Sequence, residues 1–184
     1  MARAAARLFA ERGYHGTSMQ DLADALGLLR GSLYAHIGSK QDLLADVVDE
    51  GADRFLERGR RAQAMAGSAE QRLTEFLVGH SETAIGHLEA ATVFLNEWRY
   101  LDAERRARVK AKRDDYESIL RAIISHGIAA QEFRSDLDVA MTGRLLLSAG
   151  NWLYTWYRPK GRLSPAEIGQ CFAQTLVRGL KEGS

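Results

Sequence analysis

Side chains suited to hydrogen bonding with a nucleic acid gather between residues 27 and 41. This stretch contains no acidic residue, and its polar donors include Arg30, Ser32, Tyr34, His36 and Lys40. A guanidinium can donate to the acceptors of guanine or to a phosphate, and the other groups can donate to phosphate oxygens. Gly31 has no side chain and would let a partner come close to the main chain. Because no carboxylate would repel a phosphate here, we interpret the stretch as a DNA-facing surface.

Short helices separated by glycines must position these side chains. Capping signals and apolar spacing predict helices at residues 2–12, 17–25 and 30–36, and a glycine follows each of them. Two short helices joined by a tight turn that contains glycine are typical of a helix-turn-helix, whose second helix enters the major groove. The helix at residues 30–36 is therefore the expected recognition helix.

The predicted recognition helix has a polar face and an apolar face. Leu33 and Ile37 are four residues apart and are expected to face a core. An ordinary helical bundle is the alternative, but a bundle would need apolar residues where this short helix carries polar ones. Thr17 and Lys40 begin the neighbouring helices, where free amides and the helix dipole also favour a phosphate.

The remainder of the chain predicts more helices and no sheet. It has two prolines, at 159 and 165, and no alternating run of β-branched residues. The further predicted helices cover residues 39–61, 68–87, 89–100, 102–130, about 136 to before Pro159, and 164–181. We expect an all-α chain of nine helices, with a helix-turn-helix domain over residues 1–46 and a second helical domain over residues 47–184.

The composition is that of a globular protein with a core. Hydrophobic residues make up 46% of the 184 residues, and the formal net charge is only +1, so an overall basic excess does not argue for DNA binding. The lone Cys171 provides no disulfide and no cysteine-based zinc site, which fits a reducing cytoplasm. The longest apolar-rich segment, residues 145–157, is too short to span a membrane. We expect a cytoplasmic protein with no membrane partner.

Sequence motifs of enzymes are absent. The chain has no H-E-x-x-H zinc motif, no Walker A loop, no glycine-rich dinucleotide turn and no nucleophile elbow. His80 and His87 lie two helical turns apart, with Glu82 and Glu89 nearby, but no third ligand pattern accompanies them. We expect no catalytic residue, no metal and no cofactor.

Six short motifs in the first 46 residues resemble one family of DNA-binding domains. The motifs are FAERGY at 9–14, TS at 17–18, DLA at 21–23, GSLY at 31–34, SK at 39–40 and LL at 43–44. In order and spacing they resemble the TetR-family domain. The resemblance implies an all-helical homodimer whose last two helices form a four-helix bundle with those of its partner. It also implies a base contact at Arg30 and phosphate contacts at Thr17, Ser32, Tyr34, His36 and Lys40.

Three features depart from the pattern of that family. Leu29 stands where the recognition helix is usually capped by Ser or Thr, and Ala35 and Ile37 replace residues that are often aromatic. The first helix begins almost at Met1, whereas many relatives carry a basic arm ahead of it. Either this chain lacks that contact with DNA, or the natural start lies upstream.

The second half resembles one branch of the family. Residues 132–134, 136–138 and 156–159 resemble repressors of fatty-acid and steroid-ring catabolism, which respond to acyl-coenzyme A thioesters. Candidate effector-binding residues are the apolar Phe94, Trp98 and Trp152, the basic Arg105 and Arg108, and the polar series Arg144, Ser148, Asn151 and Thr155. The basic residues would receive phosphates, and the polar series would orient a ligand unless it faces water or a dimer interface. The tryptophans 98, 152 and 156 are expected first as core residues.

The last helix carries a broad apolar stripe. Ile168, Phe172, Leu176 and Leu180 recur every four residues, and Gly179 would permit a close approach. We predict that these five residues form a two-fold interface together with the preceding helix.

These features together predict a repressor of transcription. It would bind a pseudo-palindromic operator as a homodimer and leave it when a small molecule favours another state of the second domain; the resemblance to the catabolic repressors implies an acyl-coenzyme A as that molecule. Two alternatives stay open. One is a sensor of hydrophobic drugs, or an activator, with the same fold, and the other is a helical ligand-binding protein that does not bind DNA.

Overall fold

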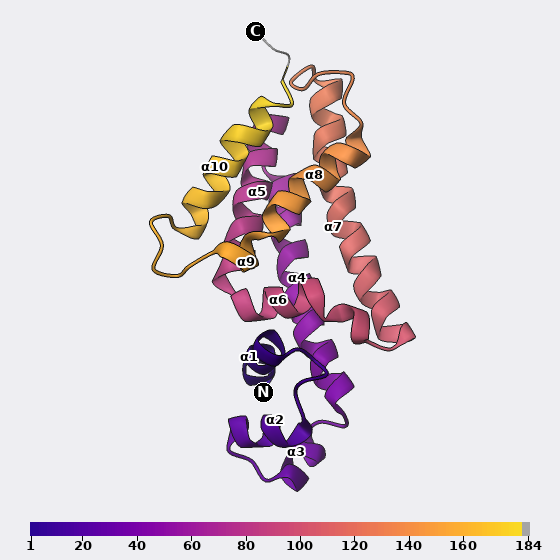
Figure 1. Cartoon of the computed structure of the whole chain (residues 1–184). Helices are drawn as coiled ribbons and strands as arrows, with labels where there is room; N and C mark the ends of the chain where they lie inside the picture. The colour runs from indigo at the N-terminus through magenta and orange to yellow at the C-terminus, as the bar shows by residue number, and fades with distance from the viewer. Residues whose placement is uncertain (182–184) are drawn as a thin grey trace. The chain divides into compact units, whose positions relative to one another are not determined.

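A computed structural model describes residues 1–181, except for the side chain of His36, and this part of the chain contains helices and no strand (Figure 1). The helices are α1 (Ala2–Arg12), α2 (Met19–Leu26), α3 (Arg30–His36), α4 (Lys40–Ala64), α5 (Ala69–Gly86), α6 (Leu88–Asn96), the 3₁₀ turn η1 (Trp98–Tyr100), α7 (Ala103–Ala129), α8 (Val139–Asn151), α9 (Leu153–Trp156) and α10 (Pro165–Arg178). Their order confirms the predicted all-α class.

Two predicted helix starts were wrong. Ser18, not Thr17, caps α2, because the Ser18 hydroxyl accepts from the amide of Asp21, whose carboxylate accepts from the Ser18 amide in return. The helix predicted to begin at 135 or 136 begins later, at Val139. Asp138 caps it by accepting from the amides of the second and third helical residues. That predicted helix is also interrupted at Trp152, so that the single turn α9 follows α8.

The chain packs into two compact units. Unit 1 contains residues 1–53 and 87–112, and unit 2 contains residues 54–86 and the chain from residue 113 onward. Helices α4 and α7 each contribute a first part to unit 1 and a later part to unit 2. The predicted domain division after residue 46 stays a prediction.

Apolar residues of the first three helices form the core of unit 1 with the start of α4. Phe9, Leu22, Leu33 and Leu43 are almost completely buried, and Ile37 is buried as predicted. Helix α6 packs against α1. Helix α3 buries Leu33 and leaves Arg30, Ser32 and Tyr34 exposed.

In unit 2, α10 lies alongside α5 (Figure 1). A Cβ atom at Gly169 would lie 2.6 Å from the Cα atom of Val78, so glycine is what lets these two helices approach so closely. Helices α8 and α9 also pack on α5. The rings of Phe55 on α4, Phe76 and His80 on α5, and Tyr116 on α7 form a buried cluster.

Candidate nucleic-acid interface

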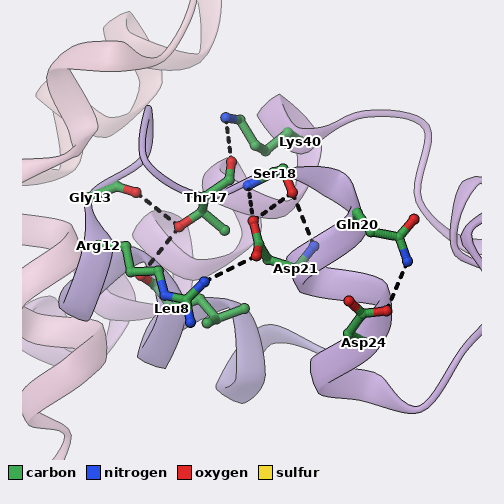
Figure 2. A network of polar contacts seen from close by, with 9 residues as sticks. All are labelled: Leu8, Arg12, Gly13, Thr17, Ser18, Gln20, Asp21, Asp24 and Lys40. Atoms are coloured by element: carbon green, nitrogen blue, oxygen red, sulfur yellow. Dashed lines mark hydrogen bonds and ion pairs between the residues drawn. The ribbon is translucent and has the colours of Figure 1, made fainter.

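A network of polar contacts fixes α2 against the end of α1 (Figure 2). Asp21 accepts hydrogen bonds from the amide and hydroxyl of Ser18 and forms a 3.0 Å ion pair with Arg12. The bonds to Ser18 are the main cause of a lowered pKa at Asp21, and the charge of Arg12 adds to it. The first helix of the helix-turn-helix is thereby held in a defined orientation.

Thr17 is not at the surface, contrary to the prediction that it contacts a phosphate. Its side chain is completely buried, and its hydroxyl donates to the carbonyl of Gly13 at 2.9 Å (Figure 2). The hydroxyl therefore stabilises the turn after α1. The neighbouring Ser18 is the exposed residue at this helix start.

Lys40 has a structural role that its sequence position does not reveal. Its ammonium donates to the carbonyls of Tyr14 at 2.9 Å and Thr17 at 2.7 Å, and it lies 4.2 Å from the centroid of the Tyr14 ring. Partial burial lowers its pKa. Only one N–H of the ammonium is left for the predicted contact with a phosphate.

Replacing Lys40 by methionine should therefore destabilise the fold. Hydrogen bonds to a charged group contribute about 1.5–3 kcal/mol each, and partial exposure reduces this, so we expect a loss of about 1–2 kcal/mol in urea unfolding. The matched control is Arg30→Met on the exposed face of α3, which should unfold like the parent. Unchanged stability of Lys40→Met, with weaker salt dependence of DNA binding, would instead assign Lys40 to a phosphate.

The outward face of α3 carries the predicted DNA contacts. Arg30, Ser32 and Tyr34 are exposed, and the guanidinium of Arg30 lies 5.8 Å from the centroid of the Tyr34 ring. Apart from its neighbours along the helix, no atom lies within 4 Å of the position that a Cβ of Gly31 would take. The predicted contact through His36 falls on a side chain outside the described residues. The other predicted residues of α3 thus share one accessible surface.

The sequence did not predict a set of contacts that joins the helix-turn-helix to residues 97–100. The amide of Tyr14 donates to Glu97 at 2.6 Å, and the rings of Tyr14 and His15 contact Tyr100. The side chain of Gln41 donates to the carbonyl of Tyr100 at 2.7 Å. Partners more than 50 residues apart leave no local signal in a sequence.

Opposed charges line a cleft of about 370 Å³ between α4 and α7 within unit 1. The acidic side chains are Asp42, Asp46 and Asp49, and the basic ones are Arg105, Arg108 and Lys112. Arg105 pairs with Asp42 and Asp102, which raises its pKa, and Lys112 lies 2.7 Å from both Asp49 and Asp53. These carboxylates already neutralise Arg105, so its predicted role as a phosphate ligand is disfavoured and stays a prediction. Arg108 lines the cleft without an ion pair among the described residues.

The predicted effector-binding residues are divided between the two units. Phe94 is buried in the core of unit 1 beside Gly51, and Trp98 and the arginines at 105 and 108 also belong to unit 1. The polar series of α8 and α9 belongs to unit 2, where Arg144 and Ser148 are exposed and Asn151 and Thr155 are half-buried. Trp152 is 62% exposed and Trp156 is 44% exposed, so the expectation that they are core residues was wrong.

A second cleft, of about 250 Å³, follows α9 in unit 2. Its lining residues are Trp156, Tyr157, Arg158, Gly161, Arg162, Leu163 and Ile168. Neither of its two arginines forms an ion pair with a carboxylate in the described part of the chain. Sequence reasoning noted the first three residues through a resemblance but missed Arg162 and Leu163.

The predicted interface stripe of α10 is divided between two faces. Ile168 and Leu180 are buried within their own protomer, so their predicted place in a dimer interface was wrong. Gly179 is exposed at the helix end and makes no close approach within its own protomer. Phe172 and Leu176 are half-buried and remain accessible. Four large apolar side chains of α8 and α9 are also exposed, namely Met141, Leu145, Trp152 and Trp156.

His80 is part of the buried core of unit 2. Its Nδ1 lies 3.0 Å from the hydroxyl of Tyr116, and burial lowers its pKa to about 4. The ring is therefore neutral at pH 7. Within the described residues, no three His, Cys, Asp or Glu side chains are grouped so that they could hold a metal ion.

Comparison with known families identifies the helix-turn-helix. The model of "Bacterial regulatory proteins, tetR family" matches residues 2–47, and that of "Tetracyclin repressor-like, C-terminal domain" matches residues 66–180. The chain belongs to the TetR family. It is a DNA-binding transcriptional regulator. None of the helices in residues 1–181 has the length and apolar character needed to cross a membrane.

Relatives of this TetR-family chain match it over nearly its whole length. It is 30% identical to the HTH-type transcriptional repressor KstR2 of Mycolicibacterium smegmatis, over 97% of this chain and 87% of the relative. The structure of the TetR-family regulator PfmR of Thermus thermophilus has a TM-score of 0.90 at 34% identity and covers 98% of both chains. AibR, crystallised with isovaleryl coenzyme A and operator DNA, has a TM-score of 0.83 at 30% identity, over 97% of this chain and 95% of AibR.

Proposed function

We propose that this regulator is a homodimeric repressor that an acyl-coenzyme A thioester releases from its operator. The single observation that carries DNA recognition is the exposed surface of α3, where Arg30, Ser32 and Tyr34 are accessible while Leu33 is buried. The repressor KstR2 and the complex of AibR with isovaleryl coenzyme A support the sign of regulation and the effector class. The chain acts in the cytoplasm as a regulator and not as an enzyme.

The cleft after α9 offers chemistry that suits coenzyme A. The Trp156 and Tyr157 side chains provide aromatic surface on which an adenine can stack, while Arg158 and Arg162 can hold phosphates. The charged cleft beside α4 suits the phosphates less well, because Arg105 and Lys112 are already paired with carboxylates. We therefore place the coenzyme A phosphates at Arg158 and Arg162.

The proposed function is tested by operator release. DNA selected from a random library by the parent protein is labelled, and binding is followed by fluorescence anisotropy. Isovaleryl- and palmitoyl-coenzyme A are added, with the free acids and coenzyme A itself as controls. We expect the thioesters to release the protein where the free acids do not. Equal release by the free acids would exclude the thioester, and the absence of any selected DNA would refute DNA binding.

Replacing both Arg158 and Arg162 by alanine should weaken the response to acyl-coenzyme A. The two lost charge-assisted contacts together reduce affinity about tenfold or more, so half-maximal release should need at least about tenfold more thioester while operator binding is unchanged. Arg108→Ala is the matched control and should respond like the parent. A weaker response of Arg108→Ala, together with an unchanged response of the double variant, would place the phosphates in the charged cleft beside α4.

A further inference from the structure

Leu29 presents a large apolar side chain to solvent directly before the recognition helix. It is the N-cap residue of α3, its backbone is extended, and its side chain makes no capping bond. At 81% it is the most exposed of the large hydrophobic residues in the described part of the chain. A Ser, Thr, Asp or Asn at this position would contribute about 1 kcal/mol by capping α3, so leucine gives up stability here.

Gly31, two residues further on, is also a residue that lowers the stability of α3. It lies inside α3 without a positive φ angle, and a Cβ placed on it would meet nothing within 4 Å. Glycine in a helix is less stable than alanine by about 0.5–1 kcal/mol. No neighbour in the protein therefore requires glycine at this position, and its backbone is open to the approach of an external partner.

The chemistry of the major groove offers a partner for the leucine. The first residues of a recognition helix are those that reach base edges. Arg30 lies next to Leu29 and is exposed, and it suits the two acceptors of guanine. The one apolar group on base edges in this groove is the 5-methyl group of thymine.

We propose that Leu29 is a specificity-determining residue that packs on the 5-methyl group of a thymine beside the base pair contacted by Arg30. The inference rests on DNA binding through α3. Leucine adds no hydrogen bond, so its preference for thymine comes from removing the methyl group from water. Burial of one methyl-sized group corresponds to about fourfold in affinity per half-site, or about fifteenfold for two half-sites.

The test removes the methyl group from DNA and the side chain from the protein. In the operator selected by the parent, each symmetric pair of thymines is replaced in turn by deoxyuridine, which keeps every hydrogen bond and lacks only the methyl group. At one thymine pair, we expect the replacement by deoxyuridine to weaken binding of the parent about fifteenfold. The same replacement should weaken binding of Leu29→Ala less than twofold. Ser32→Ala, which removes an exposed polar group from the same helix, is the matched control and should keep the full loss.

The possible outcomes separate this inference from the proposed function. If the parent and Leu29→Ala lose the same affinity at every thymine pair, Leu29 contacts no methyl group and the inference is wrong, although DNA binding stands. If no DNA is selected at all, both fail. Urea unfolding of Leu29→Ala should match the parent, because the side chain is exposed, and Leu29→Ser should unfold at higher urea because it restores the cap.

Discussion

Leu145→Glu should produce a folded monomer that binds the operator at least about 100-fold more weakly than the parent. Leu145 is 60% exposed on α8, and the exposed Met141 and Trp152 lie one turn before it and two turns after it, on the same face. Such a surface on a monomer indicates an interaction site. In a dimer, the second recognition helix binds as an intramolecular event, which raises affinity by about 10²–10⁴-fold. A charge placed in the interface removes that gain.

Sedimentation and DNA binding together test the dimer. The parent should sediment as a dimer at micromolar concentration and should prefer two half-sites to one, whereas Leu145→Glu should bind both DNAs equally weakly. Gln174→Glu adds the same charge at another exposed position, on α10, and should behave like the parent. Dimers of Leu145→Glu with full operator affinity would show that this face of α8 is not the interface.

The parts of the fold that the sequence predicted are those with local signals. The glycines after the first helices and the spacing of Leu33 and Ile37 both act within one or two turns, so they predicted which face of α3 is buried. The start of α8 was harder, because Ser135, Asp136 and Asp138 can all cap a helix. Packing, not propensity, decides among such competing caps.

The parts that the sequence could not predict depend on distant partners. A lysine at a helix start predicts a contact with a phosphate. At Lys40, however, the carbonyls of Tyr14 and Thr17 from an earlier loop accept two of its hydrogen bonds, and the sequence does not reveal this. The stripe on α10 is similar, because a period of four residues does not say which members face the same protomer. Gly169, whose missing side chain admits α5, is the signal that could have separated Ile168 from Phe172.

Acidification should destabilise the protein through the buried His80. The pKa of an unfolded histidine is about 6.5, and burial lowers that of His80 to about 4. Between these values the unfolded chain binds a proton that the folded chain does not. The free energy of unfolding therefore falls as the pH falls from about 6.5 to about 4, and at pH 4 the loss approaches about 3 kcal/mol. Above pH 6.5 this contribution to the pH dependence vanishes.

Urea unfolding of the parent and of His80→Gln at several pH values isolates this effect. Carboxylates that titrate below pH 5 are common to both proteins, so the difference between the two curves reports His80 alone. His80→Gln should be less stable at pH 7, because it loses ring contacts with Phe55 and Tyr116, but its stability should fall less between pH 6.5 and 4. Tyr116→Phe removes the hydroxyl that lies beside Nδ1 and should keep the steep dependence, because the histidine stays buried. Parallel curves for the parent and His80→Gln would mean that the buried histidine takes up its proton as readily in the folded as in the unfolded chain.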